Sequence, residues 1–213
     1  MLDSLLTPVI KPAVRPLIKW LDKHNISPDQ LTLGGFAVGL LAVPLIILGW
    51  YYVALAIILG NRLIDGLDGE LARFQNSSSS AGGFLDICLD FLFYASIPLA
   101  FGLAAPAQWG IPAMVLLVSF IGTGSSFLAF AIAAEKYAID RPQFANKSFY
   151  YMQGLTEGTE TILFFVAVCI WPQWFPILAY VFAAACSITI VTRIAGGYKT
   201  LQRAEQQRST PNA

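Results

Sequence analysis

The chain contains six mostly apolar runs of about 17–25 residues, the length that an α-helix needs to cross a bilayer. Short segments rich in aromatic, polar or turn-forming residues separate the runs. Because 56% of the residues are hydrophobic and only 12% are charged, a soluble domain of this size would lack polar surface. We therefore predict an all-α integral membrane protein with six transmembrane helices. The predicted spans are about 31–49, 52–73, 83–104, 110–134, 155–171 and 175–196.

The segments that flank the spans complete the predicted organisation. In residues 1–26, apolar positions recur at helical spacing between lysines and arginines. This pattern predicts an amphipathic juxtamembrane helix on the inner leaflet, although a helix packed on its own bundle would show it too. The run Ser-Pro-Asp-Gln at 27–30 is typical of a helix start with a capping box. Residues 1–205 are expected to form one membrane domain, and the polar residues 206–213 a disordered tail.

Basic residues indicate how the chain is oriented. They precede the first span, end the second, lie between the fourth and fifth, and follow the sixth, whereas the loops after the first, third and fifth spans contain none. The positive-inside rule then places both termini in the cytoplasm. The formal net charge is zero, so bulk charge gives no reason to expect a nucleic-acid partner.

Four aspartates lie near the cytoplasmic ends of the second and third predicted spans. Asp65 and Asp68 are three positions apart and share a helix face, and Asp86 and Asp90 are four apart and share another. The link between the two spans is short, which makes them antiparallel neighbours. At 1.5 Å per residue, both pairs reach about 12 Å from this link. We therefore expect the four carboxylates to meet.

We expect such a cluster of carboxylates to bind cations. Insertion into a bilayer costs about 3 kcal/mol for each central aspartate, and the four charges also repel one another. Divalent cations remove both problems, and a carboxylate-only site favours Mg²⁺, Mn²⁺ or Ca²⁺. A pair of metals suits phosphoryl transfer. Glycines at 66, 69, 82 and 83 would admit a ligand or allow tight helix packing, and Arg73 would pair with a phosphate or anchor the topology.

The pattern D-x2-D-G-x2-A-R-x8-G-x3-D-x3-D resembles the signature of the CDP-alcohol phosphotransferase family. Its eight fixed positions are Asp65, Asp68, Gly69, Ala72, Arg73, Gly82, Asp86 and Asp90. The six-span layout is similar to that of the family, so the resemblance covers most of the chain. Residues 28–32, 122–130 and 147–161 also resemble the family, the last two in a poorly characterised bacterial inner-membrane branch.

The resemblance implies that an acceptor hydroxyl attacks the substituted phosphate of a CDP-alcohol and that CMP leaves. It implies two divalent cations, Mg²⁺ or Mn²⁺, on Asp65, Asp68 and Asp86, with Asp90 as general base and further ligand. The residues that would border the CDP group are Gly69, Ala72, Arg73 and Gly82. The expected donor is CDP-diacylglycerol, used for phospholipid biosynthesis on the cytoplasmic face of a bacterial inner membrane. Homodimers are common in the family, and these residues give no sign of one.

Polar residues outside the motif are the candidates for acceptor binding. Lys147 and Arg193 would suit a phosphorylated acceptor, whereas Glu157 and Glu160 would suit hydroxyls or a cationic head group. The same residues can be explained without a ligand: the basic ones by the positive-inside rule, and the glutamates by capping of the fifth span. The alternative functions are the same chemistry with another CDP-alcohol donor or a soluble polyol phosphate, and an intramembrane cation carrier. A carrier is disfavoured because its charges would lie near the membrane midplane.

Overall fold

The computed structural model describes residues 14–137, 156 and 158–209, and every regular element in these ranges is helical. Residues 14–23 form a helix that precedes α2. The elements that follow are α2 (Pro28–Leu40), α3 (Ala42–Ile47), α4 (Tyr51–Phe74), α5 (Ser80–Ala104), α6 (Pro106–Lys136), α7 (Gly158–Ile170), the 3₁₀ turn η2 (Pro172–Trp174) and α8 (Phe175–Ser209).

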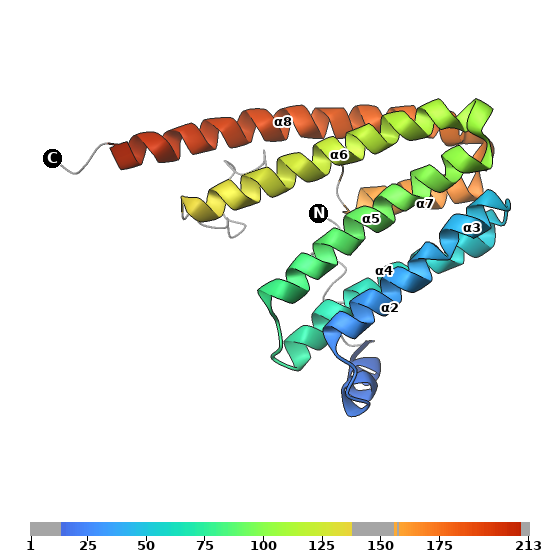
Figure 1. The fold of residues 1–213 in the computed structure, drawn as a ribbon, viewed down its shortest axis with the longest axis horizontal. Helices are drawn as coiled ribbons and strands as arrows, with labels where there is room; N and C mark the ends of the chain where they lie inside the picture. Colours follow the sequence, from blue (N-terminus) through green and yellow to red (C-terminus); the bar gives the residue numbers. More distant parts are fainter. Residues whose placement is uncertain (1–13, 138–155, 157, 210–213) are drawn as a thin grey trace.

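Each predicted span corresponds to one observed segment. Figure 1 shows α6 and α8 side by side along one edge, α2 and α4 along the other, and α5 and α7 between them. Within the described ranges, four segments are long and apolar enough to cross a membrane: Pro28–Ile47, Ser80–Ala104, Pro106–Lys136 and Pro172–Gln206. The shorter α7 has 13 residues, and α4 carries several charges in its second half. An all-helical membrane fold is therefore confirmed, while the count of six spans stays a prediction.

The first span starts as its sequence predicts but is not one continuous helix. Ser27 and Gln30 form the predicted capping box: each side chain accepts a hydrogen bond from the other's backbone N–H, at 3.2 and 3.0 Å. The helix ends at Leu40, and α3 begins two residues later. Pro44 explains the break, because its ring clashes with the carbonyl of the residue four positions earlier and it has no N–H to donate.

The last helix is longer than its predicted span. α8 continues to Ser209, about 20 Å beyond the predicted end at residue 196. It therefore takes in residues 206–209, part of the segment predicted as a disordered tail, while 210–213 lie outside the described residues. The reason is composition: the end of α8 is rich in Leu, Gln, Arg, Ala and Glu, which favour helix although they are too polar to suggest a span.

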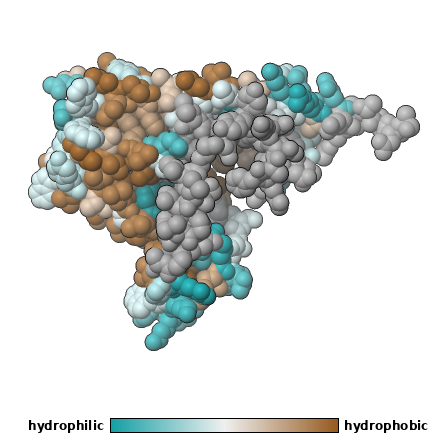
Figure 2. Space-filling view, turned by 180° about the vertical axis from the view of Figure 1, so that it is seen from behind, coloured by the Kyte–Doolittle hydropathy of each residue, from teal (hydrophilic) through white to brown (hydrophobic). Residues whose placement is uncertain are grey.

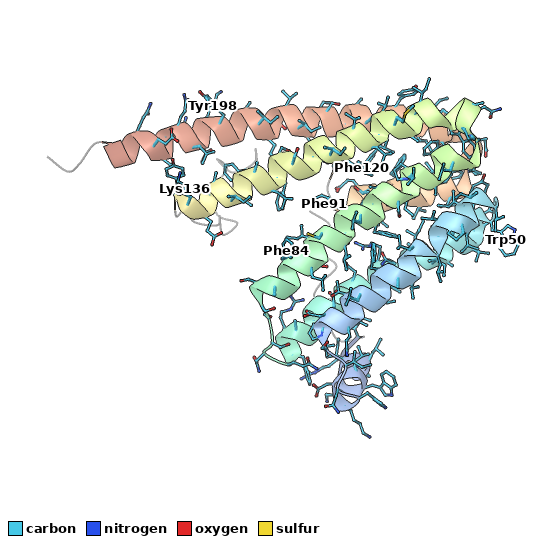
Figure 3. The ribbon with its side chains drawn as sticks, in the orientation of Figure 1. Trp50, Phe84, Phe91, Phe120, Lys136 and Tyr198 are labelled. Atoms are coloured by element: carbon cyan, nitrogen blue, oxygen red, sulfur yellow. The ribbon has the colours of Figure 1, made fainter. Side chains whose placement is uncertain are left out.

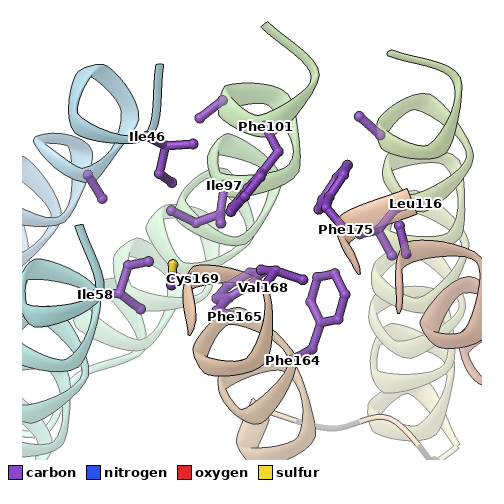
Figure 4. Packing of buried hydrophobic residues seen from close by; sticks show 14 of the residues in the cluster. Ile46, Ile58, Ile97, Phe101, Leu116, Phe164, Phe165, Val168, Cys169 and Phe175 are labelled. Atoms are coloured by element: carbon purple, nitrogen blue, oxygen red, sulfur yellow. The ribbon is translucent and has the colours of Figure 1, made fainter. Parts of the chain in front are cut away.

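An apolar core holds the helices in register. Figure 4 shows buried side chains from α3 to α8 packed together, with aromatic rings at its centre. The rings of Phe101 and Phe175 stack with centroids 4.6 Å apart, and those of Phe164 and Phe182 lie 4.8 Å apart. Lipid tails are as apolar as these side chains, so close van der Waals packing stabilises the bundle. Both α4 and α5 pack against α2 and α3, and this arrangement sets where their aspartates meet.

The helix at 14–23 packs one edge against α4. Ile18 and Leu21 are buried beside Leu67 and Leu71, whereas Trp20 on the other side is 53% exposed. The buried edge agrees with packing on the bundle, and the exposed edge leaves an apolar residue for a membrane surface. Figure 2 shows hydrophilic residues gathered at the bottom of the molecule, where this helix lies, and again at the upper right, with hydrophobic surface over much of the left and upper-left part.

Candidate active site

Three aspartates from two antiparallel helices converge. Asp65 and Asp68 on α4 and Asp86 on α5 each place one carboxylate oxygen within 4.8 Å of the other two. Oxygens that bind one hard cation at 2.0–2.6 Å lie no more than about 5 Å apart. The donor set and its spacing therefore fit a divalent cation of the Mg²⁺ or Mn²⁺ type. The structure brings together these three residues as their helical spacing predicts.

Helix α2 supports the cluster through Thr32. Its hydroxyl is within hydrogen-bond distance of a carboxylate oxygen of Asp68 and, at 3.0 Å, of the carbonyl of Pro28. Asp68 is also the most buried of the three carboxylates, with 6% of its surface exposed. Thr32 belongs to the segment 28–32 that resembles the family, and its position in the sequence suggests no role of its own. The contact shows that the start of α2 orients one carboxylate of the trio on α4.

The fourth aspartate, Asp90, lies beside this trio and forms an ion pair with an arginine. Asp90 accepts a hydrogen bond from Nη2 of Arg62 at 2.7 Å, and the same guanidinium lies 3.3 Å from both carboxylate oxygens of Asp65. Arg62 was not among the residues expected to form the site. The available signal was an arginine well inside an apolar span, three residues before Asp65 and so on the same helix face.

The guanidinium of Arg62 is enclosed by further contacts. Its Nε and Nη2 donate to the Asn61 side-chain oxygen at 3.1 and 3.0 Å, and its Nη1 donates to the Tyr94 hydroxyl at 2.9 Å. Its central carbon lies 5.2 Å from the ring centroid of Phe93 and 5.1 Å from that of Tyr94. Asn61 in turn donates to the Gly35 carbonyl on α2 at 2.9 Å. Residues of α2, α4 and α5 together thus hold the Arg62 guanidinium in place.

The glycines in and beside the motif differ in what surrounds them. A Cβ added at Gly66 or Gly83 would meet no atom within 4 Å, so these positions leave open space beside the cluster. A Cβ at Gly82 would lie 3.1 Å from a carboxylate oxygen of Asp29, which indicates a close helix contact instead. Arg73 is 59% exposed and bonds to Glu70 at 2.8 Å. A Cβ at Gly69 would lie 3.6 Å from the Arg73 guanidinium, so open space lies at Gly66 and Gly83 and the motif positions Gly69 and Gly82 have close neighbours.

The candidate acceptor residues lie in different surroundings. Arg193 on α8 is 7% exposed, and its Nη1 donates to the Thr123 carbonyl on α6 at 2.9 Å. It lines a cavity of about 710 Å³, bounded by α5, α6, α8 and the start of α7. Figure 3 labels two aromatic residues of its wall, Phe91 on α5 and Phe120 on α6. Glu160 lies in the first turn of α7 and does not line this cavity. Lys147 and Glu157 lie outside the described residues.

Comparisons with known proteins agree with this geometry. A family model described as CDP-alcohol phosphatidyltransferase matches residues 25–191. The inner membrane protein YnjF of Escherichia coli K12 is 56% identical over 207 residues, which cover 97% of this chain and 100% of that protein. The archaetidylinositol phosphate synthase of Pyrococcus horikoshii is 33% identical over 139 residues, which cover 61% of this chain and 74% of that protein.

Solved structures share the fold. The phosphatidylinositol phosphate synthase of Mycobacterium tuberculosis with CDP-DAG bound aligns with a TM-score of 0.64 at 17% identity, covering 86% of this chain and 92% of that one. The same enzyme with manganese and citrate aligns with a TM-score of 0.62 at 18% identity, covering 86% and 88%. The resemblance carried by the eight motif positions is thus confirmed over most of the length: the chain belongs to the CDP-alcohol phosphatidyltransferase family and is a metal-dependent phosphotransferase of the membrane.

Proposed function

We propose that this protein transfers the phosphatidyl group of CDP-diacylglycerol to the hydroxyl of an acceptor alcohol and releases CMP. The observation that carries the proposal is the convergence of Asp65, Asp68 and Asp86, with Asp90 beside them. Two facts about similar proteins support it. A solved enzyme of the same fold has CDP-DAG bound, and another of its structures contains manganese.

The carboxylates are proposed to hold two divalent cations, Mg²⁺ or Mn²⁺. The ligands would be Asp65, Asp68, Asp86 and Asp90. When bound, such cations would clamp the diphosphate oxygens and offset the charge that develops as CMP leaves. The protein's own contribution is to present hard oxygen ligands on helices that the core keeps in fixed register.

Asp90 is proposed to act as the general base. It would take the proton of the acceptor hydroxyl while the hydroxyl oxygen bonds to the lipid-bearing phosphorus and the bond from that phosphorus to the oxygen of CMP breaks. Asp90 is suited to this role because it lies one helical turn from Asp86 and outside the trio of closely spaced oxygens. Its bond to Arg62 holds the carboxylate in place.

The CDP group is proposed to lie along the open side of the motif. Gly69, Ala72, Arg73 and Gly82 would border it. The empty space beside Gly66 and Gly83 supports this placement, because a nucleotide could approach the helix backbones there. The exposed guanidinium of Arg73 could exchange its single bond to Glu70 for a bidentate contact with a phosphate.

The acceptor is proposed to enter the cavity that Arg193 lines, and to carry a phosphate. A mostly buried guanidinium at the wall of a 710 Å³ cavity favours an anionic group over a cationic one. Lys147 is proposed as a second cation for the same group, and Glu157 and Glu160 stay candidates for its hydroxyls. The site is proposed to face the cytoplasmic side of a bacterial inner membrane, which the distribution of basic residues supports. A homodimer stays a prediction.

A panel of acceptors tests this proposal. Purified protein with CDP-diacylglycerol and Mg²⁺ is offered alcohols with and without a phosphate, and the lipid product is identified by mass. We expect a product with a phosphorylated acceptor, and Arg193→Gln should raise its KM about 10- to 100-fold, since a charge-assisted hydrogen bond contributes about 1.5–3 kcal/mol. Arg203→Gln, at an exposed position of α8, serves as the control and should leave KM unchanged. An unchanged KM in Arg193→Gln, or product formation with unphosphorylated alcohols alone, would contradict the acceptor site.

A further inference from the structure

The four motif carboxylates are not equivalent. Asp65, Asp68 and Asp86 form a compact trio, whereas Asp90 is bound to Arg62 at 2.7 Å. Asp65 belongs to both groups, because its two oxygens lie 3.3 Å from the guanidinium. The cluster therefore consists of one cation-sized site and one ion pair that share a carboxylate. A second divalent cation bound by Asp65 and Asp90 would meet the positive charge of Arg62.

Arg62 is held firmly in this position. Its side chain is 15% exposed, and each of its three nitrogens donates at least one hydrogen bond. The aromatic faces of Phe93 and Tyr94 lie against its guanidinium. A planar group fixed by a side-chain amide, a phenol and two rings loses little further freedom when it also binds carboxylates. Arg62 is thus a permanent feature of the site in this structure.

We propose that Arg62 is an internal cation that competes with the second divalent cation for Asp65 and Asp90. The inference rests on the proposed function, since it concerns the same metal site. A divalent cation bound to Asp65 and Asp90 would lie close to the guanidinium, which is 3.3 Å from Asp65 and 2.7 Å from Asp90. Two positive charges that close repel each other strongly in a partly buried site. Without donor, the protein should bind one divalent cation tightly at the trio and a second one weakly. The diphosphate of the donor brings negative charge into the site and would favour the second cation.

A role confined to holding α4 against α5 would give the opposite result. If Arg62 only stabilised the fold, its removal would loosen the cluster and weaken the binding of every cation. If it competes, its removal should strengthen binding of the second cation, because Arg62 is the cation that pairs with Asp65 and Asp90 among the residues that the structure describes. The sign of the change in affinity therefore separates the two roles.

The experiment counts Mn²⁺ bound to the purified full-length protein, without donor, from the EPR signal of free Mn²⁺. Wild type, Arg62→Gln and Arg62→Lys are compared, with Arg203→Gln as the control for loss of one positive charge. We expect one tight Mn²⁺ in wild type, and a second-site affinity raised at least about tenfold in Arg62→Gln. Arg62→Lys should lie between them, because an ammonium keeps the charge but lacks the fork that holds two carboxylates. The control should behave as wild type.

Thermal unfolding shows whether each variant is folded. If Arg62→Gln does not fold, the inference is tested by comparing Arg62→Lys with wild type. Arg62→Lys must then bind the second Mn²⁺ more tightly than wild type does. Two equally tight Mn²⁺ ions in wild type, or a second-site affinity that the folded variants leave unchanged or lower, would overturn the inference without affecting the proposed transfer. Failure of wild type to bind any Mn²⁺ would instead remove the metal site on which the proposed function depends.

Discussion

Replacing Asp90 with asparagine is expected to abolish CMP release while the protein stays folded. Asparagine has the same shape, and its side-chain oxygen can still accept the hydrogen bond from Arg62, so the contact between α4 and α5 persists. The amide cannot take a proton from the acceptor hydroxyl. General base catalysis contributes about 10²–10⁴ to a rate, so CMP release should fall at least about 100-fold. Chromatographic measurement of CMP, with thermal unfolding in parallel, checks both halves of the prediction.

Asp22→Asn is the matched control for this substitution. Asp22 precedes α2, outside the carboxylate cluster, and accepts a hydrogen bond from the Gln75 side chain at 3.0 Å. The same change of a carboxylate to an amide should leave CMP release at the wild-type rate there. Release at the wild-type rate from Asp90→Asn would show that another group accepts the proton.

Removal of divalent cations is expected to stop the reaction completely and reversibly. The cluster contains four carboxylates and the guanidinium of Arg62, so its formal net charge is −3. The diphosphate of the donor adds further negative charge. Bound cations supply several kcal/mol of charge stabilisation in such reactions, so excess chelator should reduce the rate at least about a thousandfold.

The measurement is CMP release in excess chelator, followed by addition of Mg²⁺ or Mn²⁺. Restoration by these ions, and no restoration by monovalent salt of equal ionic strength, is the expected pattern, because only a hard divalent cation suits the oxygen ligands. Full activity in excess chelator would contradict a metal-dependent site on Asp65, Asp68 and Asp86.

Much of the fold follows from local features of the sequence. Apolar run length predicts where the observed helices lie, apart from the break between α2 and α3, and the capping box at 27–30 gives the start of α2. The convergence of the aspartates also follows, because spacings of three and four residues and a short link determine which faces of two neighbouring helices meet. These features depend on neighbours in the chain, so a single sequence reveals them.

Other features depend on contacts between distant residues. That Asp90 pairs with Arg62 rather than joining the trio is set by the rotation of α4 against α5, which the core packing determines. The hydroxyl of Thr32 reaches Asp68 because α2 packs against both helices, which helical spacing alone does not show. The break at Leu41 had a local signal in Pro44, and the length of α8 had one in its helix-forming residues, but hydrophobicity alone hides both.

Phosphatidyl transfer predicts where the phosphate of the donor ends up. CDP-diacylglycerol carrying an isotopic label in its lipid-bearing phosphate is incubated with the purified protein, Mg²⁺ and the accepted alcohol, and both products are isolated. We predict that all of the label appears in the lipid product and that the released CMP is unlabelled, in equal amount. Label in the nucleotide product, or no nucleotide release with any acceptor while the protein carries cations across a vesicle membrane, would contradict phosphatidyl transfer at this site.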